Sequence, residues 1–182
     1  MSKRLILLGF TFFFLSACGS ILLQPVVPGK LLILPPSEGT YTGLLKQKVT
    51  MDARGEQHQF IVVIRLDQTQ LKLRALLPTG QPILSIDYDG QLLTQDNLSS
   101  IALPSEDILA MIQFSLWPIN SLNKHYLPSN GWQLSDTPEQ RLLQTVERKV
   151  LSVDYLSSDE LLVKNYLHDY QVRIEMLEKT GL

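Results

Sequence analysis

The side chains that could perform acid–base or metal chemistry are few and far apart in the sequence. The histidines are His58, His125 and His168, and none pairs with another at the one-turn spacing that zinc-binding helices use. The sequence also lacks the Gly-x-Ser-x-Gly turn of serine hydrolases, the Walker loop and the glycine pattern of dinucleotide-binding folds. We therefore expect a protein that is not an enzyme and that needs no metal ion or cofactor.

Among the scattered carboxylates, which leave a hydrolase as the open alternative, two adjacent acidic pairs stand out, Glu106-Asp107 and Asp159-Glu160. The first pair follows Pro104-Ser105, a typical start of a helix, where carboxylates interact favourably with the helix dipole. The second pair follows two serines in a segment typical of a turn. We expect both pairs to face water.

The single cysteine, Cys18, lies where its thiol could be modified, and it leaves no partner for an intrachain disulfide. Residues 5–15 are almost wholly apolar and follow the basic pair Lys3-Arg4. A membrane-spanning helix needs about 20 such residues, so this run has the size of a signal-peptide core instead. It ends in Leu15-Ser16-Ala17-Cys18, with small residues before the cysteine.

This tetrapeptide resembles the lipobox of bacterial lipoproteins. The resemblance implies that residues 1–17 are removed as a signal peptide, and that Cys18 carries a diacylglycerol on its sulfur and, in most Gram-negative bacteria, an N-acyl group. Two or three acyl chains anchor a protein firmly to a membrane. Gly19 follows, and the absence of Asp there implies delivery by the lipoprotein-sorting machinery to the periplasmic face of the outer membrane. The alternative is a lone cysteine that merely follows a signal sequence.

The composition is that of a single globular domain. The 182 residues include 16 basic and 18 acidic side chains, for a net charge of −2, and 45% are hydrophobic. Such a balance gives no reason to expect nucleic-acid binding, and we expect a monomer. Residues 18–40 contain several prolines and glycines and are interpreted as a tether, in which Leu31-Leu32-Ile33-Leu34 could still pack on the domain. Residues 41–182 form the domain.

Most of the sequence from Tyr41 alternates between apolar and polar residues, which is typical of half-buried strands. We expect antiparallel strands at residues 41–51, 57–67, 71–77, 84–88, 141–146, 150–156, 161–166 and 170–177. Asp89-Gly90, residues 157–159 and His168-Asp169 are the expected turns. Helical spacing follows Pro104 and ends at Pro118, and the stretch up to Trp132 is expected to be rich in loops. The fold class is therefore mainly β (α+β).

The order of these elements resembles that of the outer-membrane lipoprotein receptor LolB and, more distantly, its soluble partner LolA. The resemblance starts with a strand that leads into the turn Pro78-Thr79-Gly80-Gln81, and it continues through a helix that ends near Trp117-Pro118 to the segment after Gly131-Trp132. The order is similar, and more closely so, to that of an uncharacterised family of Gram-negative lipoproteins known only as a domain of unknown function. The resemblance implies an incomplete antiparallel β-barrel that helices close, around an apolar cavity for acyl chains.

A helix laid across the concave face of a curved sheet encloses a space between them. We expect this space to be lined by Phe60, Val62, Ile64, Leu71, Leu73, Leu84 and Ile86 from the strands and by Ile108, Met111, Ile112 and Leu116 from the helix. The alternative is that these residues fill a solid core, because alternation predicts burial and does not predict a cavity.

Two functions remain open from the sequence. The first is a membrane-anchored lipoprotein that binds or transfers a lipid or another acylated molecule in its cavity. The second is a non-catalytic accessory or scaffold lipoprotein of an envelope assembly, with no ligand. One departure matters, because LolB has an apolar residue at the tip of a loop that inserts its cargo, whereas the matching turn, residues 78–82, has none.

Overall fold

The computed structural model describes residues 30–98 and 104–181. Cys18 and the expected signal peptide lie outside the described residues. Within them, ten strands form one antiparallel sheet, accompanied by two α-helices and two short 3-10 helices. The strands are β1 Gly43–Ala53, β2 Glu56–Leu66, β3 Leu71–Leu76, β4 Pro82–Tyr88, β5 Leu93–Asn97, β6 Gln133–Asp136, β7 Gln140–Gln144, β8 Lys149–Tyr155, β9 Glu160–Asn165 and β10 Tyr170–Gly181. The helices are η1 Pro36–Glu38, α1 Ser105–Leu116, α2 Ile119–His125 and η2 Pro128–Asn130.

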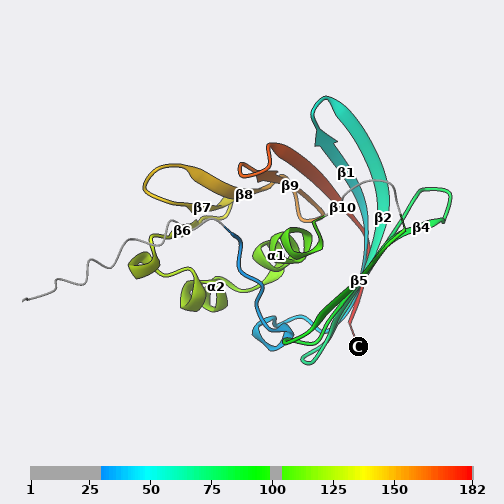
Figure 1. Cartoon of the computed structure of the whole chain (residues 1–182), viewed down its shortest axis with the longest axis horizontal. Coiled ribbons are helices and arrows are strands. Elements are labelled where there is room, and N and C mark those ends of the chain that lie inside the picture. Colours follow the sequence, from blue (N-terminus) through cyan, green and yellow to red (C-terminus); the bar gives the residue numbers. More distant parts are fainter. Residues whose placement is uncertain (1–29, 99–103, 182) are drawn as a thin grey trace, which may run out of the picture.

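The sheet is open and strongly curved. Its strand order is β5-β4-β3-β2-β1-β10-β9-β8-β7-β6, so the first and last strands pair in the middle and β5 and β6 are the edges. All the remaining pairs of neighbouring strands in the sheet are consecutive in the sequence. The segment between β5 and β6 carries α1 and α2, and α1 lies on the concave side of the sheet (Figure 1). This arrangement confirms a mainly β fold in which helices cover an open antiparallel sheet.

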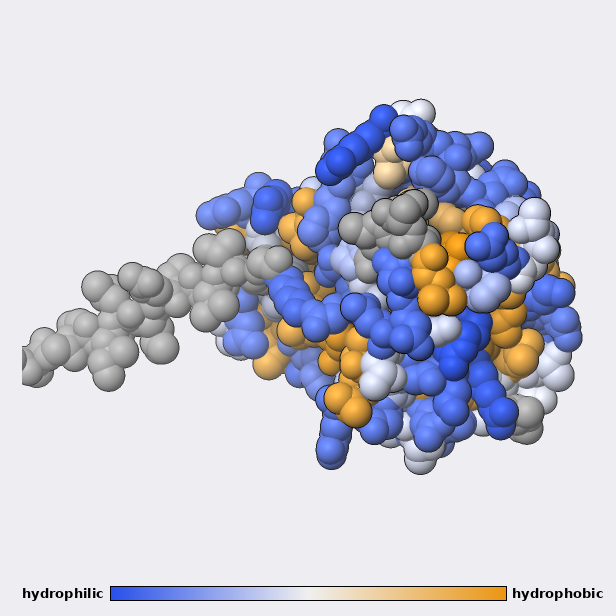
Figure 2. Space-filling model, turned by 45° about the vertical axis from the view of Figure 1, so that its right-hand side comes forward, coloured by the Kyte–Doolittle hydropathy of each residue, from blue (hydrophilic) through white to orange (hydrophobic). Residues whose placement is uncertain are grey.

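Period-two burial explains the central strands. In β2, the even-numbered residues from Phe60 to Leu66 are buried while their odd-numbered neighbours are half-buried or exposed. In β3, Leu71, Leu73 and Ala75 are buried in the same way. The predicted strands there are confirmed, because one face of each strand packs inward and the other meets solvent. The outer surface in the view of Figure 2 is mainly hydrophilic, with small apolar areas between polar ones.

The helical region differs from the prediction in one respect. Helix α1 begins at Ser105 and ends at Leu116, as the sequence indicates. Pro118, however, is also the residue that precedes α2, where its fixed φ of −59° and its carbonyl start a second helix. The Pro118 carbonyl accepts hydrogen bonds from the backbone N–H groups of Ser121 and Leu122 at 3.0 and 3.2 Å. No helix among the described residues is long and apolar enough to cross a bilayer.

Residues 30–40, which we call the N-terminal strap, are packed against the two helices. Leu31 and Leu34 are buried in the core. The Gln113 side chain of α1 donates to the Leu34 carbonyl and accepts from the Leu34 N–H, at 2.6 and 2.7 Å. The Ser121 hydroxyl of α2 donates to the Glu38 carbonyl at 2.8 Å. The part of the expected tether that the structure describes is therefore a fixed part of the domain.

Both edge strands, β5 and β6, were absent from the prediction. Their residues are mostly polar, with Leu93 and Leu134 only half-buried. Because neither face is continuously apolar, these edges show little alternation in the sequence. The turn predicted at Asp89-Gly90 is present but is longer than a two-residue hairpin loop, since β4 ends at Tyr88 and β5 begins at Leu93. Gly90 alone there has a positive φ, +97°, and the Asp89 carboxylate accepts two backbone N–H bonds.

Candidate functional site

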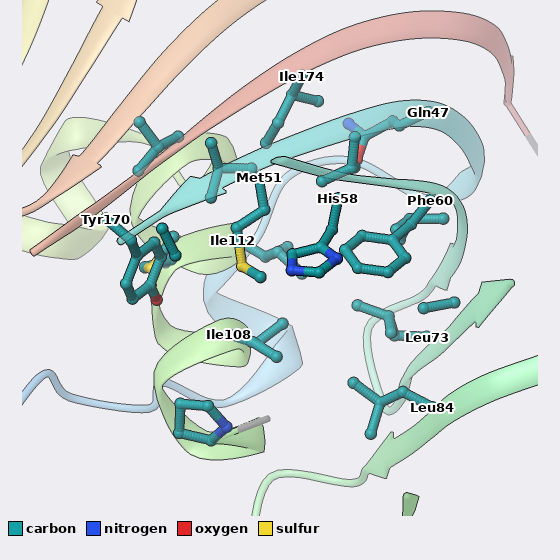
Figure 3. Close-up of a pocket in the computed structure, with 18 of the residues that line it drawn as sticks. Gln47, Met51, His58, Phe60, Leu73, Leu84, Ile108, Ile112, Tyr170 and Ile174 are labelled. Atoms are coloured by element: carbon teal, nitrogen blue, oxygen red, sulfur yellow. The ribbon is translucent and has the colours of Figure 1, made fainter. Parts of the chain in front are cut away.

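A cavity of about 600 Å³ lies between the concave face of the sheet and α1 (Figure 3). Its volume falls within the range of roughly 300–1,000 Å³ of small-molecule sites. The lining is mostly apolar and comes from strands β1 to β4, β9 and β10 and from α1. It comprises Gln47, Val49, Met51, Ala53, Arg54, Glu56, His58, Phe60, Val62, Leu73, Ala75, Ile83, Leu84, Pro104, Ile108, Met111, Ile112, Ser115, Val163, His168, Tyr170, Val172 and Ile174.

The strand residues of the lining form rows across the sheet, because directly paired residues of antiparallel strands lie on the same face. In one row, Gln47 of β1 pairs with Val62 of β2, Val62 with Ala75 of β3, and Ala75 with Leu84 of β4. On its other side Gln47 pairs with Met176 of β10. We call these five residues the Gln47 row. Four of its five side chains are apolar.

The next row beyond the Gln47 row belongs to the solid core. Leu45 pairs with Ile64, Ile64 with Leu73 and Leu73 with Ile86, and all four side chains are almost completely buried. Of this Leu45 row only Leu73 touches the cavity. The cavity therefore ends blindly between the two rows.

The strap and the end of α1 fill the space beyond that blind end. A methyl group added to Gly39 of the strap would lie 3.2 Å from the Trp117 ring, and one added to Gly90 would lie 3.4 Å from Pro36. Trp117 itself is 1% exposed. The strap thus lies in contact with both the α1–α2 junction and the β4–β5 turn, and a side chain at Gly39 would require Trp117 to shift.

Helix α1 supplies the wall opposite the sheet. Ile108, Met111, Ile112 and Ser115 follow each other at the spacing of one helical face, and all four line the cavity. Ile112 lies opposite Met51 and His58 in the close-up of Figure 3. The other face of α1, which carries Gln113, is bound to the strap, so the helix is held in place over the cavity.

The polar part of the lining gathers at the β1–β2 hairpin. Arg54 and Glu56 are exposed there, and His58 Nε2 lies 3.5 Å from Glu56 Oε2. Arg54 and Gly55 form the tip with positive φ angles of 53° and 79°. The cavity consequently has a polar mouth at the hairpin and a mostly apolar blind end, next to Gln47.

A second polar contact borders the mouth. His168 Nε2, in the turn between β9 and β10, lies 2.8 Å from Asp107 Oδ2 in the first turn of α1. The Asp107 side chain is only 14% exposed. The prediction that Asp107 faces water is therefore wrong, because the turn predicted at His168-Asp169 folds back onto the helix start.

Tyr170 closes the side of the cavity next to β9. Its hydroxyl lies 2.9 Å from the sulfur of Met111 and accepts a hydrogen bond of 3.3 Å from the Asn165 amide. Burial raises the pKa of Tyr170 to about 12, against the opposing effect of the Asn165 hydrogen bond. At neutral pH this part of the wall is therefore uncharged.

A family model described as "Protein of unknown function (DUF3261)" matches residues 44–178. The chain belongs to this family. The matched DUF3261 region runs from β1 into β10, so it includes every lining residue of the cavity. No curated protein is significantly similar to the chain.

Within the DUF3261 region, the structure brings seven of the eleven predicted lining residues together around the cavity. They are Phe60, Val62, Leu73, Leu84, Ile108, Met111 and Ile112. Ile64 and Ile86 lie instead in the Leu45 row, and Leu71 lies one row further out, each with no exposed surface. Leu116, at the end of α1, packs against the core and does not line the cavity.

The prediction did not include the lining residues of β1 and β10. Gln47, Val49 and Met51 alternate along β1, and Tyr170, Val172 and Ile174 alternate along β10. Period-two spacing could have identified both sets. Among residues 30–98 and 104–181, no cluster of histidine and acidic side chains could hold a metal ion. Chemically, the arrangement provides a mostly apolar space in which a hydrocarbon group would be shielded from water.

Proposed function

We propose that this protein is a lipoprotein that holds an acyl chain in the cavity between its curved sheet and α1. The observation that carries the proposal is the cavity itself, about 600 Å³ with a mostly apolar blind end and a polar mouth. A ligand with a hydrocarbon tail and a polar head fits this distribution, with the tail inside and the head at the β1–β2 hairpin. Apolar burial stabilises such a complex by roughly 25 cal/mol per Å².

The arrangement of a helix over a concave antiparallel sheet supports a LolB-like role in handling lipids. In this proposed role, the protein binds or transfers a lipid without catalysis. Its covalent diacylglycerol and N-acyl group on Cys18 anchor it to the periplasmic face of the outer membrane, after passage through the lipoprotein-sorting machinery. The polar tip of the turn at residues 78–82 argues against a membrane-inserting loop of the LolB kind.

Ligand exchange is proposed to occur through the mouth and without movement of α1 away from the sheet. Gln113 binds the helix to the strap on one side. At its end, the Arg141 guanidinium donates to the carbonyls of Phe114 and Trp117 at 2.7 and 2.8 Å. The tip of the β1–β2 hairpin, Arg54 to Glu56, is exposed at the mouth, so opening there costs less free energy.

The alternative function is a scaffold lipoprotein with no ligand. A solid interior would favour it, and the cavity is the reason why we propose lipid binding instead. The protein has exposed apolar side chains such as Leu92, Leu98 and Val146, at 63%, 64% and 85% exposure. In the scaffold function, a partner would cover such groups.

The test is native mass spectrometry of the chain from Cys18 to Leu182, with Cys18→Ala, secreted into the periplasm behind a cleavable signal. We expect an adduct of lipid mass that organic extraction removes. A protein that carries no adduct and that also fails to bind a fluorescent fatty acid added afterwards would contradict the proposal.

A further inference from the structure

Gln47 is a polar residue in the apolar part of the cavity. Its side chain lines the cavity, and the residue is only 4% exposed. Figure 3 shows its amide among the lining residues at the end where Phe60 and Ile174 also lie. Its neighbours in the Gln47 row are Met176, Val62, Ala75 and Leu84, so the cross-strand neighbours offer it no polar group.

The Gln47 amide forms no hydrogen bond with any residue of the described parts of the chain, 30–98 and 104–181. Other buried amides of the protein are paired, as Gln113 is with the strap. The Gln47 amide keeps accessible surface toward the cavity and so is not among the enclosed unpaired atoms of the described residues, Ser105 Oγ and His125 Nε2. A hydrocarbon ligand that filled the cavity would enclose the amide, and an enclosed amide without a partner is destabilising. Leu45 and Val49 on either side also point inward, so the strand alternation fixes the Gln47 side chain toward the cavity.

The position of Gln47 along β1 places it far from the mouth. It lies six positions before Ala53 at the hairpin, a distance of about 20 Å at roughly 3.4 Å per residue. A tail that enters at the hairpin therefore meets hydrocarbon side chains first and the Gln47 amide last. A plain alkyl chain of that length would bury the amide against methylene groups and leave it unpaired.

We propose that the ligand of this cavity carries a hydrogen-bonding oxygen near the far end of its hydrocarbon tail, and that Gln47 selects for it. This inference rests on the proposed lipid-binding function. A carboxamide offers both an acceptor oxygen and donor N–H groups, so a hydroxyl group can donate to it and accept from it. The substrate class is a long-chain acyl compound with a hydroxyl or similar oxygen function at its tail end.

The test compares two probes that differ only at that end, hexadecanoic acid and 16-hydroxyhexadecanoic acid. The full-length protein, purified from the bacterial envelope in lipid nanodiscs, is photolabelled with a diazirine-bearing fatty acid, and each probe competes for the label. The variants are Gln47→Met, which keeps the side-chain length, and Lys46→Met, whose side chain is exposed on the outer face of β1. Comparing the two probes across variants cancels their different partition into the nanodisc lipid.

For each protein, we divide the apparent affinity of 16-hydroxyhexadecanoic acid by that of hexadecanoic acid, both measured by competition. We expect this ratio to be about tenfold higher in the wild type and in Lys46→Met than in Gln47→Met. A tenfold ratio corresponds to about 1.4 kcal/mol. Equal ratios in all three proteins, with saturable labelling, would overturn the role of Gln47 and leave lipid binding intact. Absence of saturable labelling in all three would overturn the proposed function, and with it this inference.

Discussion

The side-chain amide of Gln113 and the backbone of Leu34 form a two-bond bridge, with Leu34 N–H to Oε1 at 2.7 Å and Nε2–H to the Leu34 carbonyl at 2.6 Å. Both residues are almost fully buried, at 1% and 2% exposure. The bridge replaces the strand partner that an extended backbone ordinarily needs. It therefore couples the strap to the helix that forms one wall of the cavity.

Replacing Gln113 with Met is expected to lower the free energy of unfolding by roughly 2–4 kcal/mol, because two buried backbone groups of Leu34 lose their partners. Urea denaturation followed by tryptophan fluorescence measures this change. Gln171→Met, at an exposed position of β10, is the control and should change stability by less than about 0.5 kcal/mol. Equal effects of the two substitutions would show that the bridge contributes nothing.

Arg141 is expected to be essential for the end of α1. The residue is 7% exposed, and besides the carbonyls of Phe114 and Trp117 it binds Asp136, with Nε 3.0 Å from Oδ1. Arg141→Met should destabilise the fold by about 3 kcal/mol or more, since it leaves a carboxylate and two carbonyls without their donor. Arg173→Met removes the exposed pair with Glu160 and should cost less than about 1 kcal/mol.

Thermal and chemical denaturation of the two arginine variants measure the difference, and hydrogen exchange locates it. Faster exchange in Arg141→Met should be concentrated in the last turn of α1. A variant that exchanges there at the wild-type rate would contradict the capping role of Arg141.

The pH dependence at alkaline pH follows from two buried tyrosines. Burial raises the pKa values of Tyr126 and Tyr170 to about 12, whereas unfolded tyrosine ionises near 10. Because the folded state favours the neutral phenols, their contribution to stability is complete below pH 10 and is lost as the pH rises toward 12. Tyrosinate absorbance should therefore show a late step, which Tyr126→Phe and Tyr170→Phe each reduce. Titration of all six tyrosines near pH 10 in the folded protein would refute this.

Cys18→Ala is expected to abolish membrane attachment and to leave the fold unchanged, since the domain's core lies in residues 30–181. Fractionation of cells that express the full-length protein, with metabolic labelling by palmitate, measures both attachment and acylation. Recovery of the Cys18→Ala protein in the outer-membrane fraction would contradict the anchor.

The central fold was predictable because its strands bury one face each. The alternation of β2 and β3 predicted their inward side chains, and their bounds to within one residue. The limits of the cavity were not predictable in this way. Ile64 and Val62 lie on the same face of β2, yet one is in the Leu45 row and the other lines the cavity. Alternation specifies the face of a strand, whereas the position of the strap and α1 decides which rows stay open.

Contacts between residues far apart in the sequence could not be predicted from the local residue pattern either. Asp107 and His168 are both polar residues at element ends, which ordinarily predicts solvation. The fold of the β9–β10 turn places His168 Nε2 2.8 Å from Asp107 Oδ2. Likewise, β5 and β6 are recognisable as strands only from their neighbours β4 and β7.

The measurement that tests the central claim most directly is lipid binding by an Ile112→Trp variant. Ile112 lines the cavity and is only partly buried, so the indole should extend into the open space without overpacking the core. Gln59→Trp, on the exposed face of β2, is the matched control. We predict that Ile112→Trp keeps the wild-type melting temperature within a few degrees and loses the lipid adduct in native mass spectrometry, while Gln59→Trp keeps it. A folded Ile112→Trp protein that carries the adduct at the wild-type level would contradict the cavity as the lipid site.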